Sequence, residues 1–257
     1  MLKFIALIIG IYGLMCGLLY VKQRGMLYFP TAEVERAETR SFWFERADAR
    51  LKIWQLNAGA PAILYFGGNA ESVDGNIDAF RTWFAGYTVY LVNYRGYGGS
   101  SGQPTESALV GDALALFDHL SGEHSRIHVI GRSLGSGVAV QLAAQRPVGR
   151  LVLITPFDSI ENVASRHYPL FPVRWLIKDR FDSLAVAGDL KNPVLAIIAE
   201  GDRVIPSEHS LNLVATLDRA EVEVISLQQA SHNDVMGYRQ SQRAIQDFLP
   251  TPEAIPR

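Results

Sequence analysis

The feature that most constrains the fold of this chain is a five-residue motif, Gly131-Arg132-Ser133-Leu134-Gly135. An apolar run at residues 126–130 precedes it, and a helical pattern at residues 136–146 follows it. Strand, G-x-S-x-G and helix in this order are typical of a nucleophile elbow, in which two glycines let the strand and the helix approach closely. The motif therefore predicts an α/β fold with a strained Ser133, whose Oγ stands above the C-terminal edge of a sheet as a candidate nucleophile.

A serine nucleophile needs a general base, and the base needs an acid that orients it. A buried-strand pattern at residues 193–199 is followed by Asp202, and a strand pattern at residues 222–227 is followed by His232. Both side chains would lie at the carboxyl edge of a parallel sheet, where such sheets place their sites. We therefore expect His232 to act as the base and Asp202 as the acid. Asp158, which follows the strand at 151–154, remains the alternative acid.

The oxyanion of an acyl-transfer reaction needs hydrogen-bond donors. The backbone N–H of Leu134, directly after the candidate nucleophile, is one candidate. The other is the backbone N–H of Asn69, in a loop that begins with Gly67 and Gly68 after a predicted strand at residues 62–66. An ordinary glycine turn before a helix is the alternative interpretation of this loop.

Three motifs follow one another along the chain: Tyr65-Phe66-Gly67-Gly68-Asn69-Ala70-Glu71, Asn93-Tyr94-Arg95-Gly96-Tyr97-Gly98-Gly99-Ser100-Ser101-Gly102, and the serine motif. With them, residues 23–249 resemble the α/β-hydrolase superfamily, and more narrowly its membrane-anchored, serine-aminopeptidase-like branch, which includes protein depalmitoylases. The resemblance implies a hydrolase that works without a metal or a cofactor. It departs from the common pattern at Gly67, where many relatives have histidine.

The rest of the chain fits a mainly parallel, doubly wound sheet, because predicted strands alternate with predicted helices. Two opening strands at 41–45 and 51–56 are expected to form an antiparallel hairpin. The net charge of −2 provides no basic surface for nucleic acid. The glycine-rich loop at 94–102 has Ser101 where a dinucleotide fingerprint needs its third glycine, and neither a phosphate-loop motif nor an H-E-x-x-H zinc motif occurs.

The first part of the chain predicts a membrane anchor. Residues 4–21 form an eighteen-residue run without a charged side chain, flanked by Lys3, Lys22 and Arg24. This is long enough to span a bilayer, and it is longer than the apolar region of a cleavable signal peptide. Cys16 lies inside the run, but the residues before it do not fit a lipoprotein signal, and a lone cysteine forms no intrachain disulfide. We expect an anchor at residues 1–24 and a single hydrolase domain at residues 25–257.

The charges flanking the anchor bear on its orientation. Four basic residues, Lys22, Arg24, Arg36 and Arg40, follow the run, whereas only Lys3 precedes it. The positive-inside rule then favours a cytoplasmic catalytic domain, although large domains can be translocated regardless of charge. The side of the membrane stays open at this point.

A helical lid is predicted at about residues 157–190, where the alternation of strands and helices pauses. Its aromatic side chains, among them Phe157, Tyr168 and Trp175, would contact the substrate. In the alternative interpretation, these aromatic residues belong to a crossover helix and complete the core. A lid of this kind near a membrane would suit an ester or thioester with an acyl chain of about six carbons or more, since each buried methylene contributes about 0.8 kcal/mol.

Taken together, the sequence predicts a single-pass membrane serine hydrolase. Its substrate would be a small-molecule or lipid-like acyl ester or thioester, cleaved through an acyl-enzyme. Two alternatives remain: a serine peptidase of the aminopeptidase type, and a non-catalytic membrane scaffold that kept the fold.

Overall fold

The computed structural model describes residues 1–250 and contains one eight-stranded sheet in the order β1-β2-β4-β3-β5-β6-β7-β8. Strands β3 to β8 pair in parallel, while β1 and β2 form the antiparallel hairpin expected from the sequence, and β2 pairs antiparallel with β4. The prediction of a mainly parallel sheet is therefore confirmed. The strands are β1 (Ser41–Glu45), β2 (Arg50–Leu56), β3 (Ala62–Phe66), β4 (Thr88–Val92), β5 (Ile127–Arg132), β6 (Leu151–Ile154), β7 (Val194–Ala199) and β8 (Val222–Leu227).

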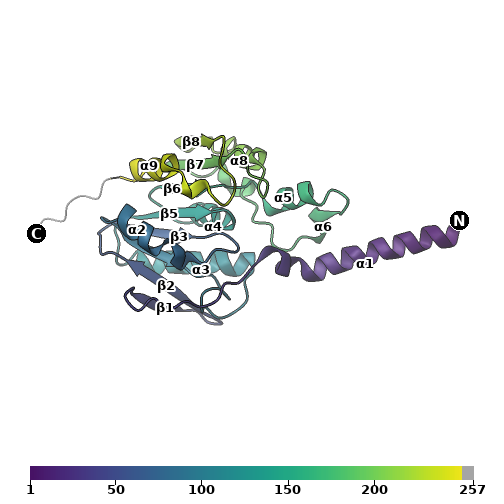
Figure 1. The fold of residues 1–257 in the computed structure, drawn as a ribbon, viewed down its shortest axis with the longest axis horizontal. Coiled ribbons are helices and arrows are strands. Elements are labelled where there is room, and N and C mark those ends of the chain that lie inside the picture. Colours follow the sequence, from purple (N-terminus) through teal and green to yellow (C-terminus); the bar gives the residue numbers. More distant parts are fainter. Residues whose placement is uncertain (251–257) are drawn as a thin grey trace, which may run out of the picture.

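Helices cover both faces of the sheet (Figure 1). The helices are α1 (Leu2–Leu27), α2 (Ile77–Trp83), α3 (Glu106–Leu120), α4 (Leu134–Ala143), α5 (Ile160–His167), α6 (Val173–Leu176), α7 (Leu184–Ala187), α8 (Ser207–Val214) and α9 (Arg239–Phe248), with 3-10 turns η1 (Val73–Asn76) and η2 (Val235–Gly237). The core residues of α3, α4 and α8 cluster with one face of the sheet, and those of α2 and α9 cluster with the other.

The central strands are buried on both faces, which explains their uninterrupted apolar sequences. In β3, for example, Leu64 and Phe66 belong to the cluster that contains α3 and α4, whereas Ile63 and Tyr65 belong to the cluster that contains α2 and α9. Successive side chains of a strand point to opposite faces, so one apolar strand supplies both halves of the core.

Helix α1 projects away from the sheet, with α5 and α6 beside its C-terminal half (Figure 1). It is long and apolar enough to cross a membrane, and none of its residues is buried against the rest of the chain. It ends at Leu27, three residues beyond the anchor boundary predicted from the sequence. Its length therefore fits a single-pass membrane anchor.

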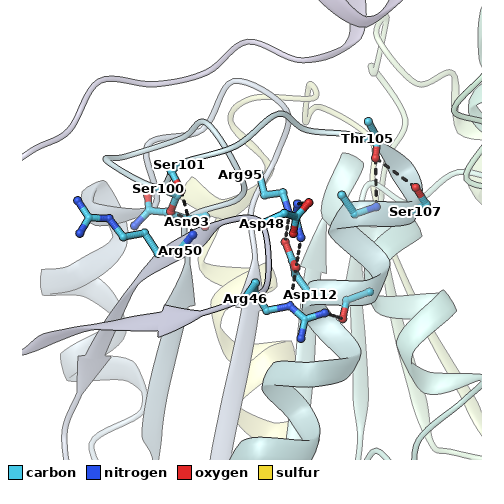
Figure 2. Close-up of polar contacts among 12 residues, drawn as sticks. Arg46, Asp48, Arg50, Asn93, Arg95, Ser100, Ser101, Thr105, Ser107 and Asp112 are labelled. Atoms are coloured by element: carbon cyan, nitrogen blue, oxygen red, sulfur yellow. Dashed lines mark hydrogen bonds and ion pairs between the residues drawn. The ribbon is translucent and has the colours of Figure 1, made fainter.

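The glycine-rich loop after β4 is held by a charge cluster around the buried residues Arg95 and Asp112, shown in Figure 2. The Arg95 guanidinium donates two hydrogen bonds to Asp112 of α3, at 2.7 and 2.9 Å, and a third to Asp48 at 2.7 Å. Arg46 donates to the same Asp112 carboxylate at 3.0 Å. These contacts tie the loop to α3 and to the turn between β1 and β2. Arg95 is therefore paired with a carboxylate from each of these two elements.

Candidate active site

Ser133 lies in a strained turn between β5 and α4. Its backbone has φ 51° and ψ −120°, a conformation that residues with a side chain rarely adopt. The turn needs both flanking glycines: a Cβ on Gly131 would lie 2.4 Å from the Gly135 carbonyl oxygen, and a Cβ on Gly135 would lie 2.0 Å from the carbonyl oxygen of Phe66. The Ser133 N–H donates to Ile154 of β6 at 2.9 Å, which ties the turn to the neighbouring strand.

The structure brings the three predicted triad residues into one hydrogen-bonded chain. The Nε2 atom of His232 lies 2.9 Å from Ser133 Oγ, and its Nδ1 atom lies 2.6 Å from Asp202 Oδ2. All three side chains are buried, although they come from three separate loops at the carboxyl edge of the sheet. Because a carboxylate can only accept, Nδ1 carries the proton and Nε2 faces the serine hydroxyl as an acceptor.

Backbone hydrogen bonds fix the orientation of Asp202. Its other carboxylate oxygen, Oδ1, accepts from the N–H groups of Val204 and Ile205, both at 2.8 Å. The turn after β7 therefore holds the carboxylate with one oxygen toward the backbone and the other toward His232. This arrangement has the geometry of an acid that selects the histidine tautomer.

The alternative acid, Asp158, serves a different histidine. Its Oδ1 accepts from the Ser159 N–H at 2.6 Å and lies 3.0 Å from Nδ1 of His209, which belongs to α8. Its Oδ2 accepts from the side-chain amides of Asn162 at 3.1 Å and Asn212 at 3.3 Å. Asp158 is thus fully engaged in joining the start of α5 to α8, and none of its hydrogen bonds involves Ser133 or His232.

The two predicted oxyanion donors belong to the start of α4 and to the loop after β3. Leu134 is the first residue of α4, so its N–H has no acceptor within the helix. In the loop after β3, a Cβ on Gly68 would lie 3.7 Å from the Ser133 Cβ, which places this loop directly against the nucleophile. The Gly68 N–H is occupied by Glu71, whereas within residues 1–250 the Asn69 N–H donates to no protein acceptor.

Asn69 is also held from outside the loop. Its side-chain amide donates to the carbonyl of Leu27 at 2.9 Å, and its own carbonyl accepts from the N–H of Phe29 at 3.1 Å and the hydroxyl of Tyr97 at 2.6 Å. The end of α1 therefore lies against the loop that carries one candidate oxyanion donor.

Glu71 and Arg132 join the active-site loops, and the sequence interpretation gave neither a role. The Glu71 carboxylate accepts from the Gly68 N–H at 2.8 Å and from the Arg132 guanidinium at 3.2 Å. Arg132 also reaches the carbonyls of His232 at 3.4 Å and Asn233 at 3.3 Å. Their positions inside two recognised motifs were the available signal, but their pairing is visible only in the fold.

Tyr65 of β3 also belongs to this network, through a hydrogen bond to Glu71. Burial, followed by the neighbouring Glu71 carboxylate, raises the pKa of the Tyr65 phenol well above its usual value. The phenol therefore stays protonated and donates to Glu71 Oε1 at 2.6 Å. The Asn76 side-chain amide donates to the same oxygen at 2.6 Å. Each of the two Glu71 carboxylate oxygens therefore accepts two hydrogen bonds.

The predicted substrate contacts in the lid fall into three different environments. Phe157 is fully buried in the core, where a Cβ on Gly137 of α4 would lie 2.8 Å from its ring, and its contact with the substrate stays a prediction. Tyr168 lines an apolar cavity beside α1. Trp175 is 78% exposed and does not line that cavity. An aromatic residue just after a strand completes the core as readily as it covers a site, and here packing against α4 decided it.

Among residues 1–250, no group of three or more His, Cys, Asp or Glu side chains is arranged to hold a metal ion. The site itself contains a hydroxyl, an imidazole that faces it and a fixed carboxylate.

Comparison with known proteins agrees with this fold. The family described as the alpha/beta hydrolase fold matches residues 61–186. An uncharacterised protein of Mycobacterium tuberculosis is 36% identical over 232 residues, covering 84% of this chain and 82% of that protein. A lysophosphatidylserine lipase of Rattus norvegicus is 33% identical over 193 residues, covering 65% of this chain and 48% of the lipase, so the match extends over about half of the lipase.

Among solved structures, the Pyrococcus furiosus esterase Pf2001 superimposes with a TM-score of 0.70 at 17% identity, covering 86% of this chain and 97% of the esterase. At this identity the likeness concerns the fold. The sheet order, the strained serine turn and the relatives agree, and the chain belongs to the α/β-hydrolase superfamily.

Proposed function

We propose that this chain is a serine hydrolase that cleaves an ester or thioester through an acyl-enzyme formed on Ser133. The observation that carries the proposal is the hydrogen-bonded chain from Ser133 Oγ through His232 to an Asp202 carboxylate that backbone N–H groups hold in place. The hydrolase fold and the lipase among the relatives support the same class of reaction.

In the first half of the reaction, Ser133 Oγ attacks the carbonyl carbon of the substrate while His232 Nε2 takes its proton. The carbonyl oxygen becomes an oxyanion, which the N–H groups of Leu134 and Asn69 would stabilise. When the tetrahedral intermediate collapses, His232 returns the proton to the leaving alcohol or thiol, and the acyl group remains on Ser133.

In the second half, a water molecule attacks the acyl-enzyme. His232 takes a proton from that water and then gives it to Ser133 Oγ, which releases the carboxylic acid and restores the enzyme. Asp202 stabilises the imidazolium in both halves without itself being protonated.

The decisive experiment combines covalent labelling with turnover. A fluorophosphonate probe should label the full-length protein in detergent, and p-nitrophenyl butyrate should be hydrolysed; Ser133→Ala should abolish labelling and lower kcat by several orders of magnitude. Ser121→Ala is the matched control, because Ser121 lies at the end of α3 and its hydroxyl bonds only the Asp118 carbonyl. Turnover by Ser133→Ala within tenfold of wild type would refute the assignment, and wild type that hydrolyses only aminoacyl amides would point to a peptidase.

We also propose that α1 anchors the domain in a membrane as a single-pass helix. Its apolar composition and its lack of buried residues support this, and the basic residues after it favour a cytoplasmic domain. The full-length chain should remain in the membrane fraction after high-salt and carbonate washes. Its release by carbonate, or a mature N-terminus near residue 22, would show that the helix is not a retained anchor.

A further inference from the structure

A cavity of about 160 Å³ lies between the C-terminal part of α1 and the lid helices α5 and α6. Its apolar walls come from both sides: Leu19, Met26 and Leu27 belong to α1, while Ile160, Ala164 and Phe171 belong to the lid. None of the triad residues is among the residues that line it.

The charged and amide side chains at this cavity are already paired with one another. Arg24 forms a two-fold hydrogen bond with the Asp179 carboxylate, at 2.8 and 3.1 Å. The Gln23 amide donates to the Leu176 carbonyl at 2.9 Å and accepts from the Lys178 N–H at 2.7 Å. Because these groups are satisfied within the protein, the cavity offers an occupant little besides apolar contact.

The lid also contacts α1 on the N-terminal side of the cavity, at Tyr12. The Tyr12 ring stacks on Phe171 with centroids 5.9 Å apart, and the Tyr12 hydroxyl donates to the Leu170 carbonyl at 2.8 Å. Tyr12 lies nine residues before Val21, the end of the uncharged run, a distance of about 13 Å along a helix that rises about 1.5 Å per residue. If α1 spans a bilayer, this part of the lid lies within the hydrocarbon layer.

The exposed side chains of the lid agree with that placement. Leu170 is 81% exposed and Trp175 is 78% exposed, although both are large and apolar. A bilayer would cover both side chains. The cavity between α1 and the lid would then face lipid, and α1 would be a wall of a ligand site as well as an anchor.

One residue that lines the cavity also contacts the candidate oxyanion loop. Leu27, which lines it, presents its carbonyl to the side-chain amide of Asn69 at 2.9 Å, and Asn69 is the candidate oxyanion residue next to Gly68. Leu27 therefore contacts both the cavity and the loop that lies beside Ser133.

We propose that this cavity binds the acyl chain of the substrate, taken laterally from the bilayer, with α1 as one of its walls. The proposal rests on the proposed function and assigns its substrate class: a lipid-like ester or thioester with a long acyl chain. It predicts that the anchor helix affects chain-length selectivity, which a simple tether would not.

The first test fills the cavity. Ala164→Trp in α5 and Leu19→Trp in α1 would occupy the space from opposite walls, so that one variant remains informative if the other does not fold. Ser165→Trp is the matched control, because Ser165 is the next residue of α5, is exposed, and does not line the cavity. Each full-length variant is assayed in mixed micelles with p-nitrophenyl butyrate and p-nitrophenyl palmitate, after titration with a fluorophosphonate.

We expect the cavity-filling variants to lower kcat/KM for the palmitate about tenfold or more while leaving the butyrate within about twofold, because buried methylenes account for the difference between the two esters. Ser165→Trp should change neither value. An unchanged ratio of the two rates in both cavity-filling variants would overturn the proposal, even though hydrolysis itself would still support the function.

The second test does not depend on turnover. The full-length protein in phosphatidylcholine vesicles is irradiated with palmitic acid that carries a diazirine in its chain, and the cross-linked peptides are mapped. Cross-links should fall in residues 19–27 and 160–177, disappear in Ala164→Trp and persist in Ser165→Trp. If wild type neither reacts with the fluorophosphonate nor hydrolyses either ester, the proposed function has failed. If wild type is active but its cross-links are absent, lie elsewhere or survive Ala164→Trp, the assignment of the cavity has failed.

Discussion

Replacing Asp202 with asparagine tests its role as the acid that orients His232. The change converts one carboxylate oxygen into an NH₂ group, and the structure determines which end of the new amide faces His232. In the native protein, Oδ1 accepts from the N–H groups of Val204 and Ile205, and Oδ2 faces His232 Nδ1. In Asp202→Asn, the amide oxygen of the new side chain can satisfy the two N–H groups only by replacing Oδ1. The amide NH₂ group then faces Nδ1, which must accept, and the proton moves to Nε2, opposite the serine hydroxyl.

The competing orientation keeps the productive tautomer but turns the NH₂ group toward two backbone N–H donors. Leaving a buried donor unsatisfied costs about 1–3 kcal/mol, so the two together cost about 2–6 kcal/mol. At about 1.4 kcal/mol per factor of ten, the productive orientation is populated about 30-fold to 10⁴-fold less than the unproductive one. We expect kcat for p-nitrophenyl butyrate to fall within this range, as it does by about 10⁴ in the serine proteases that carry the same substitution.

Asp158→Asn is the matched control, because it makes the same chemical change at the other buried aspartate that contacts a histidine. None of the Asp158 contacts involves Ser133 or His232, so kcat per folded molecule should stay within about threefold of wild type. Fluorophosphonate titration gives the active fraction of each variant. A loss smaller than tenfold in Asp202→Asn, or a larger loss in Asp158→Asn, would refute the tautomer argument.

Three further predictions concern other parts of the molecule. Glu71→Ala should destabilise the protein by about 3–5 kcal/mol in urea unfolding and lower kcat, because it leaves Arg132 without its carboxylate partner and releases the Gly68 N–H; a change below about 1 kcal/mol would contradict this role. Burial, and then two nearby guanidinium groups, lower the pKa of His128 to about 4, so between pH 7 and pH 5 the unfolded chain gains a proton that the folded chain does not. The stability contributed by neutral His128 is present above the unfolded pKa of about 6.5 and falls by about 2 kcal/mol by pH 5, a fall that should be absent from His128→Gln; equal pH dependence of the two proteins would contradict it. In vesicles of brominated phosphatidylcholine, tryptophan fluorescence should be quenched, and Trp175→Phe should remove most of that quenching; quenching unchanged by the substitution would place the lid outside the bilayer.

Much of the fold could be predicted from the sequence because its information is local. The strands are short apolar runs, and the serine turn requires glycines whose positions are visible in the motif. Ser133, Asp202 and His232 each follow a predicted strand, which places all three at the carboxyl edge of a parallel sheet. The predicted helix at residues 136–146 begins two residues earlier and ends three residues earlier in the structure, since α4 starts directly after the serine.

The rest depends on contacts between distant segments. Glu71 and Arg132 are 61 residues apart, and Asp158 and His209 are 51 residues apart, so no local pattern pairs them. The burial of Phe157 in the core could not be predicted, because an aromatic lid residue and an aromatic core residue look the same in sequence. The contacts between α1 and the lid also could not be predicted from the sequence, because an apolar run indicates a membrane span but not which residues pack against it.

The junction between α1 and the catalytic domain contains no linker. The helix ends at Leu27, whose carbonyl is bonded by Asn69; Tyr28 is already buried, and the Phe29 N–H is bonded to the Asn69 carbonyl and to Tyr97. A flexible tether lets an enzyme sample a volume set by its length, whereas this junction leaves no such freedom. With α1 in a bilayer, the hydrolase domain is held at a fixed height and tilt, and encounters with substrate become a matter of diffusion in two dimensions. Lipids in the same bilayer are then presented at high effective concentration, while those in a facing bilayer are beyond its reach.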